Sequence, residues 1–221
     1  AEAGLDRFRC ITVHMPAWVI DVHGQDRITA TVVREPVART WSHLRHIARL
    51  LDDGSRPEQL WHRPEWRSRL VDHQVRMLGA QPDPGPILPD WVDQVDEASD
   101  EDRAALAASL EVFLATAGAD ASPLGPDHLA RARDRLASLD VVGRTERLDD
   151  FVARLREASG LPLGQVTVRN AAGSAEGPPE SLAASIREAT ALDRELYDWV
   201  TATIGRPAPA RAGPVRGRPG R

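Results

Sequence analysis

The chain contains 221 residues, of which 42 % are hydrophobic and 28 % charged, with a single cysteine, Cys10; this composition supports one domain with a sizeable core and excludes an internal disulfide framework or a multi-thiolate metal site. The formal net charge is −5, and because residues 205–221 carry five arginines and no acid, residues 1–204 hold 23 arginines against 33 acids, which disfavours generic nucleic-acid binding. No run approaches the roughly 18 uninterrupted apolar residues of a membrane helix, and no signal-peptide pattern opens the chain, so we predict a soluble cytoplasmic protein without a membrane span.

The first part of the chain predicts two strands and a helix. Segments 9–15 (RCITVHM) and 27–33 (RITATVV) are rich in β-branched residues, which favour strands. Pro36 suits the first turn of a helix, where its missing N–H is harmless. Apolar residues then recur at helical spacing to about residue 51, so the pattern predicts one helix that ends before Gly54.

The middle of the chain predicts a long helical stretch followed by a loop. Residues 57–78 have helical spacing, with a break expected at Pro64. Residues 81–89 contain four prolines and predict a loop. The acidic run 90–102 matches no calcium-loop spacing, and we interpret it as the solvated start of a helix.

The last part of the chain alternates between helical and strand patterns. Segments 139–146 (LDVVGRTE) and 164–170 (GQVTVRN) favour strands. Residues 205–221 are rich in proline, glycine and arginine and predict a disordered tail. Strands that alternate with helices indicate an α/β domain with a mainly parallel sheet flanked by helices and a helix-rich C-terminal half. The expected helices of this part span about 100–117, 126–138, 147–159, 180–188 and 190–204.

An arginine stands at the junction between the second strand and the first helix, in the segment TVVREPVARTWSHLRH (31–46). The Arg34 guanidinium is a planar donor fork that suits phosphate, a helix N-terminus offers free N–H groups, and Ser42 adds a hydroxyl two turns into the helix. These residues together favour an anion site. The alternative is that Arg34 pairs with Glu35 or caps the edge of the sheet.

Four blocks of the sequence resemble the sulfotransferase family that includes heparan sulfate 2-O-sulfotransferase and its bacterial relatives. The first block is the segment 31–46, similar to a strand–Arg–Asp–Pro–Val–x–Arg–x–x–Ser signature. The others are DHQVRMLGA (72–80), LDVVGRTERLDDFVARL (139–155) and ALDRELYDWV (191–200). The four blocks occur in the family's order and extend over 170 residues, 31–200.

The resemblance implies a P-loop-kinase-like fold and a defined reaction. Members of the family transfer a sulfuryl group from 3′-phosphoadenosine 5′-phosphosulfate (PAPS) to a hydroxyl, here of a carbohydrate or small-molecule acceptor, and no metal is implied. Carried onto this sequence, Arg34 and Ser42 bind the donor's 3′-phosphate. Glu35 stands where the family usually has aspartate.

The acceptor hydroxyl needs a general base to take its proton. The resemblance implies His14, in ITVHMPAW, for this role, although Val13 stands where glycine is usual; His23 is the competing residue. His43 and His46 have a spacing that can hold a metal, but a helix surface or packing role is favoured because the resemblance implies no metal. For Gln74 and Arg76, a role facing the donor or acceptor and a role in helix packing are equally plausible.

One half of the family's donor site has no counterpart in the sequence. The family cradles the 5′-phosphosulfate with a Pro-Lys-x-Gly loop, whereas all 28 basic residues here are arginines. We therefore expect either a sulfotransferase-like domain (1–204) that is incomplete at its N-terminus, or a degenerate module that binds nucleotide without turnover. A P-loop kinase is disfavoured, because no Gly-Lys-Ser/Thr motif is present.

Overall fold

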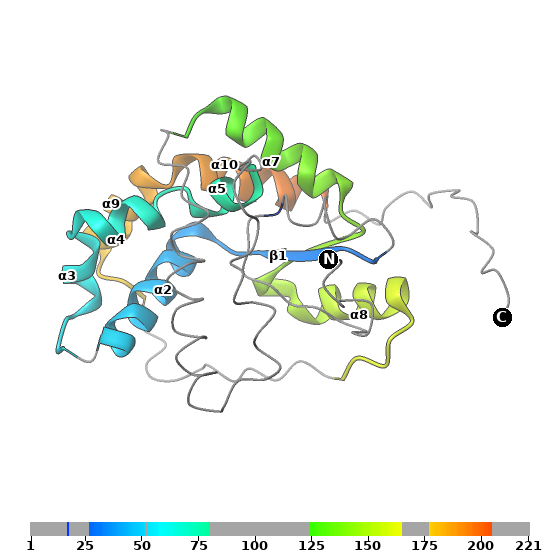
Figure 1. Ribbon diagram of the computed structural model, residues 1–221, viewed down its shortest axis with the longest axis horizontal. Helices are drawn as coiled ribbons and strands as arrows, with labels where there is room; N and C mark the ends of the chain where they lie inside the picture. Colours follow the sequence, from blue (N-terminus) through cyan, green and yellow to red (C-terminus); the bar gives the residue numbers. More distant parts are fainter. Residues whose placement is uncertain (1–16, 18–26, 52, 80–123, 165–176, 205–221) are drawn as a thin grey trace, which may run out of the picture.

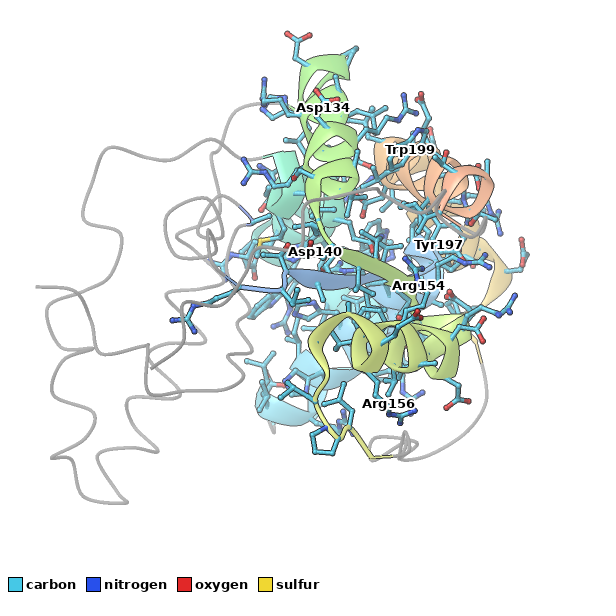
Figure 2. The ribbon with its side chains drawn as sticks, turned by 90° about the vertical axis from the view of Figure 1, so that its right-hand side faces the viewer. Asp134, Asp140, Arg154, Arg156, Tyr197 and Trp199 are labelled. Carbon is cyan, nitrogen blue, oxygen red and sulfur yellow. The ribbon has the colours of Figure 1, made fainter. Side chains whose placement is uncertain are left out.

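Two parallel strands lie at the centre of the fold (Figure 1). In the computed structural model, which describes residues 17, 27–51, 53–79, 124–164 and 177–204, strand β1 (Ala30–Val33) pairs with β2 (Val141–Arg144), and Ala30 lies opposite Val141. The Asp140 carboxylate, labelled in Figure 2, accepts both the N–H of Thr29, at 2.8 Å, and its hydroxyl, at 2.9 Å. This clamp sets the register where the two strands begin.

Helices cover both faces of the strand pair (Figure 1). Helix α8 (Leu148–Ser159) packs on β2, where Gly143 leaves room for Phe151; a Cβ at Gly143 would lie 2.6 Å from the Phe151 side chain. The Arg154 guanidinium (Figure 2) donates to the Val142 carbonyl at 2.9 Å. The opposite face carries α5 (His73–Gly79), α7 (Pro126–Ser138) and α10 (Ala191–Thr203).

The main core lies between the strands and these three helices. Because side chains alternate along a strand, Val33 and Val142 point to the same face of the sheet and enter this core together. Helix α5 approaches α7 so closely that a Cβ at Gly79 would lie 2.3 Å from the His128 carbonyl oxygen. The buried helix residues of the main core are Val75, Leu78, Leu129, Ala132, Leu136, Leu196 and Val200.

A second core lies beyond the C-terminal end of β1. It is formed by α2 (Pro36–Leu51), α3 (Pro57–Trp61), α4 (Pro64–Leu70) and α9 (Glu180–Ala189). The buried Trp61 indole donates to the Ser185 hydroxyl at 3.0 Å, so the largest side chain of this core is also satisfied as a donor. Its buried residues are Leu44, Ile47, Leu60, Trp61, Leu70, Leu182 and Ile186.

The helices largely confirm the sequence expectations. Helices 36–51 and 126–138 span the expected residues, and 147–159 becomes the short 3-10 helix η3 (Thr145–Arg147) followed by α8. The stretch 57–78 is corrected: it breaks at Pro64, as expected, and again at Asp72, whose positive φ of 45° ends any regular helix.

The strands are shorter than the composition indicated. Strand β1 begins at Ala30 rather than at residue 27, and β2 covers four residues of 139–146. The expected parallel pairing is confirmed for these two strands. The remaining expectations fall outside the described residues: 9–15, 81–89, 90–102, 100–117, the tail 205–221 and the strand 164–170, of which only Gly164 is described and is not in a strand. Within the described ranges, no helix combines the length and the apolar character needed to cross a membrane.

Candidate functional site

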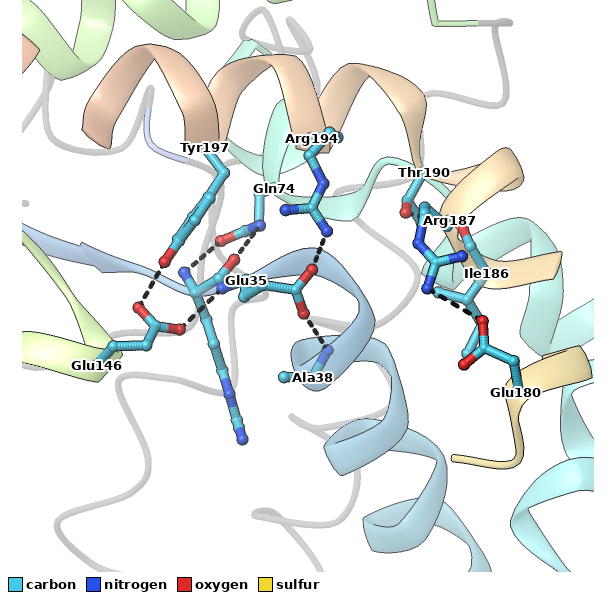
Figure 3. A network of polar contacts seen from close by, with 11 residues as sticks. Glu35, Ala38, Gln74, Glu146, Glu180, Ile186, Arg187, Thr190, Arg194 and Tyr197 are labelled. Carbon is cyan, nitrogen blue, oxygen red and sulfur yellow. Dashed lines mark hydrogen bonds and ion pairs between the residues drawn. The ribbon is translucent and has the colours of Figure 1, made fainter. Parts of the chain in front are cut away.

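The site begins where β1 ends, at Arg34. Its backbone is held by one side chain: the Arg34 N–H donates to Gln74 Oε1 at 2.9 Å, and the Gln74 Nε2 donates to the Arg34 carbonyl at 2.9 Å (Figure 3). Gln74 is 8 % exposed and lies in the first turn of α5. Within the described part of the chain, the Arg34 guanidinium makes no hydrogen bond or ion pair.

Glu35 occupies the start of α2. Its carboxylate accepts the Ala38 N–H at 2.7 Å and pairs with Arg194 of α10, while its own N–H donates to Glu146 Oε1 at 3.1 Å (Figure 3). One expectation and one alternative are corrected here. The N–H of Ala38 is capped rather than free for an anion, and Glu35 takes Arg194, not Arg34, as its ion-pair partner.

Tyr197 connects α10 to the same junction. Its hydroxyl donates to Glu146 Oε2 at 3.0 Å, so the two oxygens of Glu146 serve Tyr197 and Glu35 (Figure 3). Burial raises the pKa of Tyr197, and the adjacent carboxylate adds to the rise because it disfavours a second negative charge. Helices α2, α10 and the 3-10 turn are thereby joined around Glu146.

Asp193 is a buried residue of α10 that binds the start of α5. Its carboxylate, 1 % exposed as a residue, accepts the Gln74 N–H at 3.1 Å and the Val75 N–H at 2.7 Å, so it caps α5. Burial raises the pKa of Asp193 to about 6, although Arg39 and the two N–H donors act in the opposite direction. The ionised form of Asp193, which binds the Gln74 N–H, is therefore destabilised by burial.

Arg39 is the second cation at the junction. Burial lowers the pKa of its guanidinium to about 10; the Asp193 carboxylate opposes that shift, and the positive charge of Arg34 adds to it. Among the described residues, the buried Nη1 of Arg39 has no hydrogen-bond partner. Arg39 thus has Asp193 as its main counter-charge and still carries one buried donor without an acceptor, a combination of charge and free donor that suits an anion near this junction.

Ser42 lies on the same stripe of α2 as Arg39. The buried face of α2 runs through Thr40 and Leu44, whereas Ser42 is partly exposed and three residues beyond Arg39, which makes the two side chains neighbours on the helix. No hydrogen bond joins Ser42 to Arg34 in the described ranges. Ser42 is about 9 Å along the axis from the helix start. A phosphate that touches both Arg34 and Ser42 must therefore lie along the side of α2 rather than at its end.

The candidate base residues His14 and His23 lie outside the described residues. Ala17, three residues after His14, donates its N–H to the Met77 carbonyl of α5 at 2.8 Å. His43 lies beside His73 of α5, with ring centroids 6.1 Å apart. No group of three or more His, Cys, Asp or Glu residues that could hold a metal occurs in the described ranges.

Sequence reasoning missed Arg39 and Asp193 as members of the site. Arg39 was detectable, because it occupies a position of the first block and stands three residues before Ser42 on a predicted helix. Asp193 was not, because its partners in α5 are 118 and 119 residues away along the chain.

Comparison with known proteins gives no match: no family model, no curated protein and no solved structure matches the chain.

Proposed function

We propose that this protein is a PAPS-dependent sulfotransferase in which Arg34 and Ser42 bind the 3′-phosphate of the donor. The acceptor is a hydroxyl of a carbohydrate or a small molecule. In this proposal the two parallel strands and their helices belong to a P-loop-kinase-like fold, and the β1–α2 junction is the donor site.

One observation carries the proposal: the four sequence blocks that resemble the family meet at a single place. The first block bonds to the second through Arg34 and Gln74, and to the third through Glu35 and Glu146. The fourth block reaches the first through Arg194, and the other two through Asp193 and Tyr197. This convergence at the β1–α2 junction is what a single donor site built from the four blocks requires.

The charges at the junction also support a phosphate ligand. The Arg34 side chain has no partner in the described ranges, and the adjacent Arg39 retains an unsatisfied donor. A phosphate accepts several charge-assisted hydrogen bonds at once, so it would relieve the repulsion between the two guanidinium groups. The hydroxyl of Ser42, next to Arg39 on α2, would add a neutral contact.

The proposed transfer needs a base and a leaving group. The acceptor oxygen forms a bond to the sulfur of PAPS, the bond from sulfur to the 5′-phosphate oxygen breaks, and His14 takes the hydroxyl proton. The products are the sulfate ester and adenosine 3′,5′-bisphosphate. His14 is proposed from the sequence resemblance, and a His14→Ala variant that keeps full turnover would remove it from the mechanism.

A thermal-shift experiment tests the donor site. Adenosine 3′,5′-bisphosphate is expected to add RT ln(1 + [L]/Kd) to the free energy of unfolding and so to raise the unfolding temperature. Adenosine 5′-monophosphate should give a smaller shift at equal concentration. Arg34→Ala should abolish the difference between the two ligands. The matched control is Arg187→Ala on α9, which removes an exposed arginine outside the junction. An equal shift for both ligands in wild type contradicts the proposal.

A second candidate function is nucleotide binding without sulfuryl transfer. The observation in its favour is the absence of lysine from the whole sequence, since the family uses a lysine to stabilise charge on the leaving phosphate. Incubation with labelled PAPS and mixed hydroxyl acceptors separates the two candidates. Labelled ester above background, lost in Arg34→Ala, supports the transferase; tight bisphosphate binding without label transfer supports the binding module.

A further inference from the structure

Gln74 holds the end of β1 from the edge opposite β2. The Val33 carbonyl accepts the Thr145 hydroxyl at 3.3 Å, on the β2 side. Because backbone groups of successive strand residues point to opposite edges, the N–H and C=O of Arg34 point away from β2, toward α5. At this edge the Gln74 carboxamide satisfies both groups, as the backbone of a neighbouring strand would.

The backbone of Gln74 is fixed in turn. Its N–H donates to Asp193, and the N–H of Asp193 donates to the Asp72 carboxylate at 2.9 Å. Asp72 directly precedes α5 with a positive φ of 45°, a conformation that a non-glycine residue adopts only when its surroundings enforce it. Gln74 therefore cannot shift without disturbing the starts of both α5 and α10.

We propose that Gln74 is a positioning residue for Arg34: its carboxamide fixes the backbone from which the guanidinium projects and so sets the affinity for a 3′-phosphate without touching the ligand. This inference rests on the proposed function of the same site. It explains why the buried side chain is an amide. The position needs one acceptor and one donor at opposite tips of a planar group, which glutamine supplies and an ionised glutamate does not.

The hydrogen bonds between Gln74 and the Arg34 backbone can be tested by a substitution whose effect depends on pH, which a purely structural role would not predict. Gln74→Glu keeps the shape, but the ionised carboxylate loses the donor to the Arg34 carbonyl and faces that oxygen with negative charge. Protonation of the introduced carboxylate restores the donor. Burial favours the protonated form, whereas Arg34 and Arg39 nearby favour the ionised one. Asp72, Asp193 and His73 also titrate near this position, and they are common to wild type and variant.

The measurement is the ratio of Kd for adenosine 5′-monophosphate to Kd for adenosine 3′,5′-bisphosphate, by calorimetry at pH 5.5 and pH 8. Relative to wild type at the same pH, Gln74→Glu is expected to lower this ratio about tenfold or more at pH 8 and to recover most of it at pH 5.5. The apolar isostere Gln74→Leu should lower the ratio at both pH values. Gln59→Glu, the same change at an exposed glutamine that also accepts a backbone N–H, should not alter it.

The outcomes separate the inference from the function it rests on. Wild type without a preference for the bisphosphate overturns both. A wild-type preference that folded Gln74→Glu and Gln74→Leu retain at pH 8 overturns the positioning role alone. Should both variants unfold, amide hydrogen exchange on wild type decides: the Arg34 N–H is expected to exchange more slowly when the bisphosphate is bound, because coupling between two sites is reciprocal. Unchanged exchange of that N–H counts against the proposal.

Discussion

Asp72 and Asp193 exchange helix caps. The Asp193 carboxylate accepts two N–H groups in the first turn of α5, and the Asp72 carboxylate, directly before α5, accepts the Asp193 N–H in the first turn of α10. Each carboxylate thus satisfies orphan donors on a helix 118 to 121 residues away in sequence. The two helix starts are thereby tied together, and because Gln74 of α5 bonds to the Arg34 backbone, a change to either aspartate should alter the junction.

Removing the Asp193 carboxylate should destabilise the protein. Asp193→Ala leaves two buried N–H groups of α5 without acceptors and removes the counter-charge of Arg39, so we expect the free energy of unfolding to fall by about 2–3 kcal/mol. Urea unfolding followed by circular dichroism measures it. Asp198→Ala, an exposed aspartate on the same helix, is the control and should change stability by no more than about 0.5 kcal/mol. Equal losses in the two variants would count against the capping role.

The stability due to Asp193 should depend on pH. Its folded pKa, about 6, is above the ordinary 3.8, so the folded protein binds the proton more tightly than the unfolded chain does. The resulting stabilisation is fully present below pH 3.8 and is lost as the pH rises through about 6. The free energy of unfolding of wild type minus that of Asp193→Asn should therefore increase by about 1 kcal/mol from pH 7.5 to pH 5.

His73 acts on pH-dependent stability in the opposite sense. Burial lowers its pKa well below 6.5, with the charge of Arg39 as the next cause, so the folded state resists protonation and loses stability as the pH falls below that value. This contribution is common to wild type and Asp193→Asn and cancels in their difference. Urea titrations of both proteins at the two pH values give that difference; a decrease toward pH 5 contradicts the assignment.

The phenol of Tyr197 should ionise above its ordinary pKa of 10. Tyr197 is the single tyrosine of the chain, so absorbance at about 295 nm reports on this residue without deconvolution. Glu146→Gln removes the neighbouring negative charge and should bring the midpoint back toward 10. Glu195→Gln, an exposed change on α10, should leave it in place. A midpoint at or below 10, with circular dichroism still native at that pH, would argue against the Glu146 contact.

Gly143 should tolerate no side chain. A Cβ would lie 2.6 Å from the Phe151 side chain, so Gly143→Ala forces α8 away from β2 and should lower the free energy of unfolding by about 1–3 kcal/mol. Gly164→Ala, with no atom within 4 Å of the new Cβ, is the matched control. Combined with Phe151→Ala, the Gly143→Ala change should cost less than it does alone, because the ring atoms Cγ and Cδ2 are removed and only the Phe151 Cβ still lies 2.6 Å away. Strict additivity in denaturant titrations would exclude a clash with the Phe151 ring.

The positions of the helices were predicted well because proline at the first turn and the spacing of apolar residues determine them locally. Pro36 and Pro126 mark helix starts, and apolar spacing carries each helix to its observed end within a residue or two. The break at Asp72 escaped prediction because aspartate has no strong preference for positive φ; the reciprocal capping with α10 imposes that conformation.

The candidate site was predictable only in part. Arg34 and Ser42 are local to one segment, and their spacing on a strand–helix junction can be derived from sequence alone. The role of Gln74 was left open between ligand contact and packing; the structure gives it a third role, as the hydrogen-bond partner of the Arg34 backbone. Such a pairing leaves no periodic pattern, since it depends on where α5 lies relative to β1.

The contacts around Arg34 also constrain the order in which the chain can fold. Glu35 requires Glu146, 111 residues later, and Arg194, 159 residues later, while Gln74 requires Asp193. During synthesis, the segment 31–46 emerges long before the helix that completes its surroundings, and loop closure over such separations slows folding. A nascent chain that ends at Ala189 would contain every residue of the proposed phosphate clamp, yet it would lack Asp193 and Arg194, which hold Gln74 and Glu35, until α10 is made.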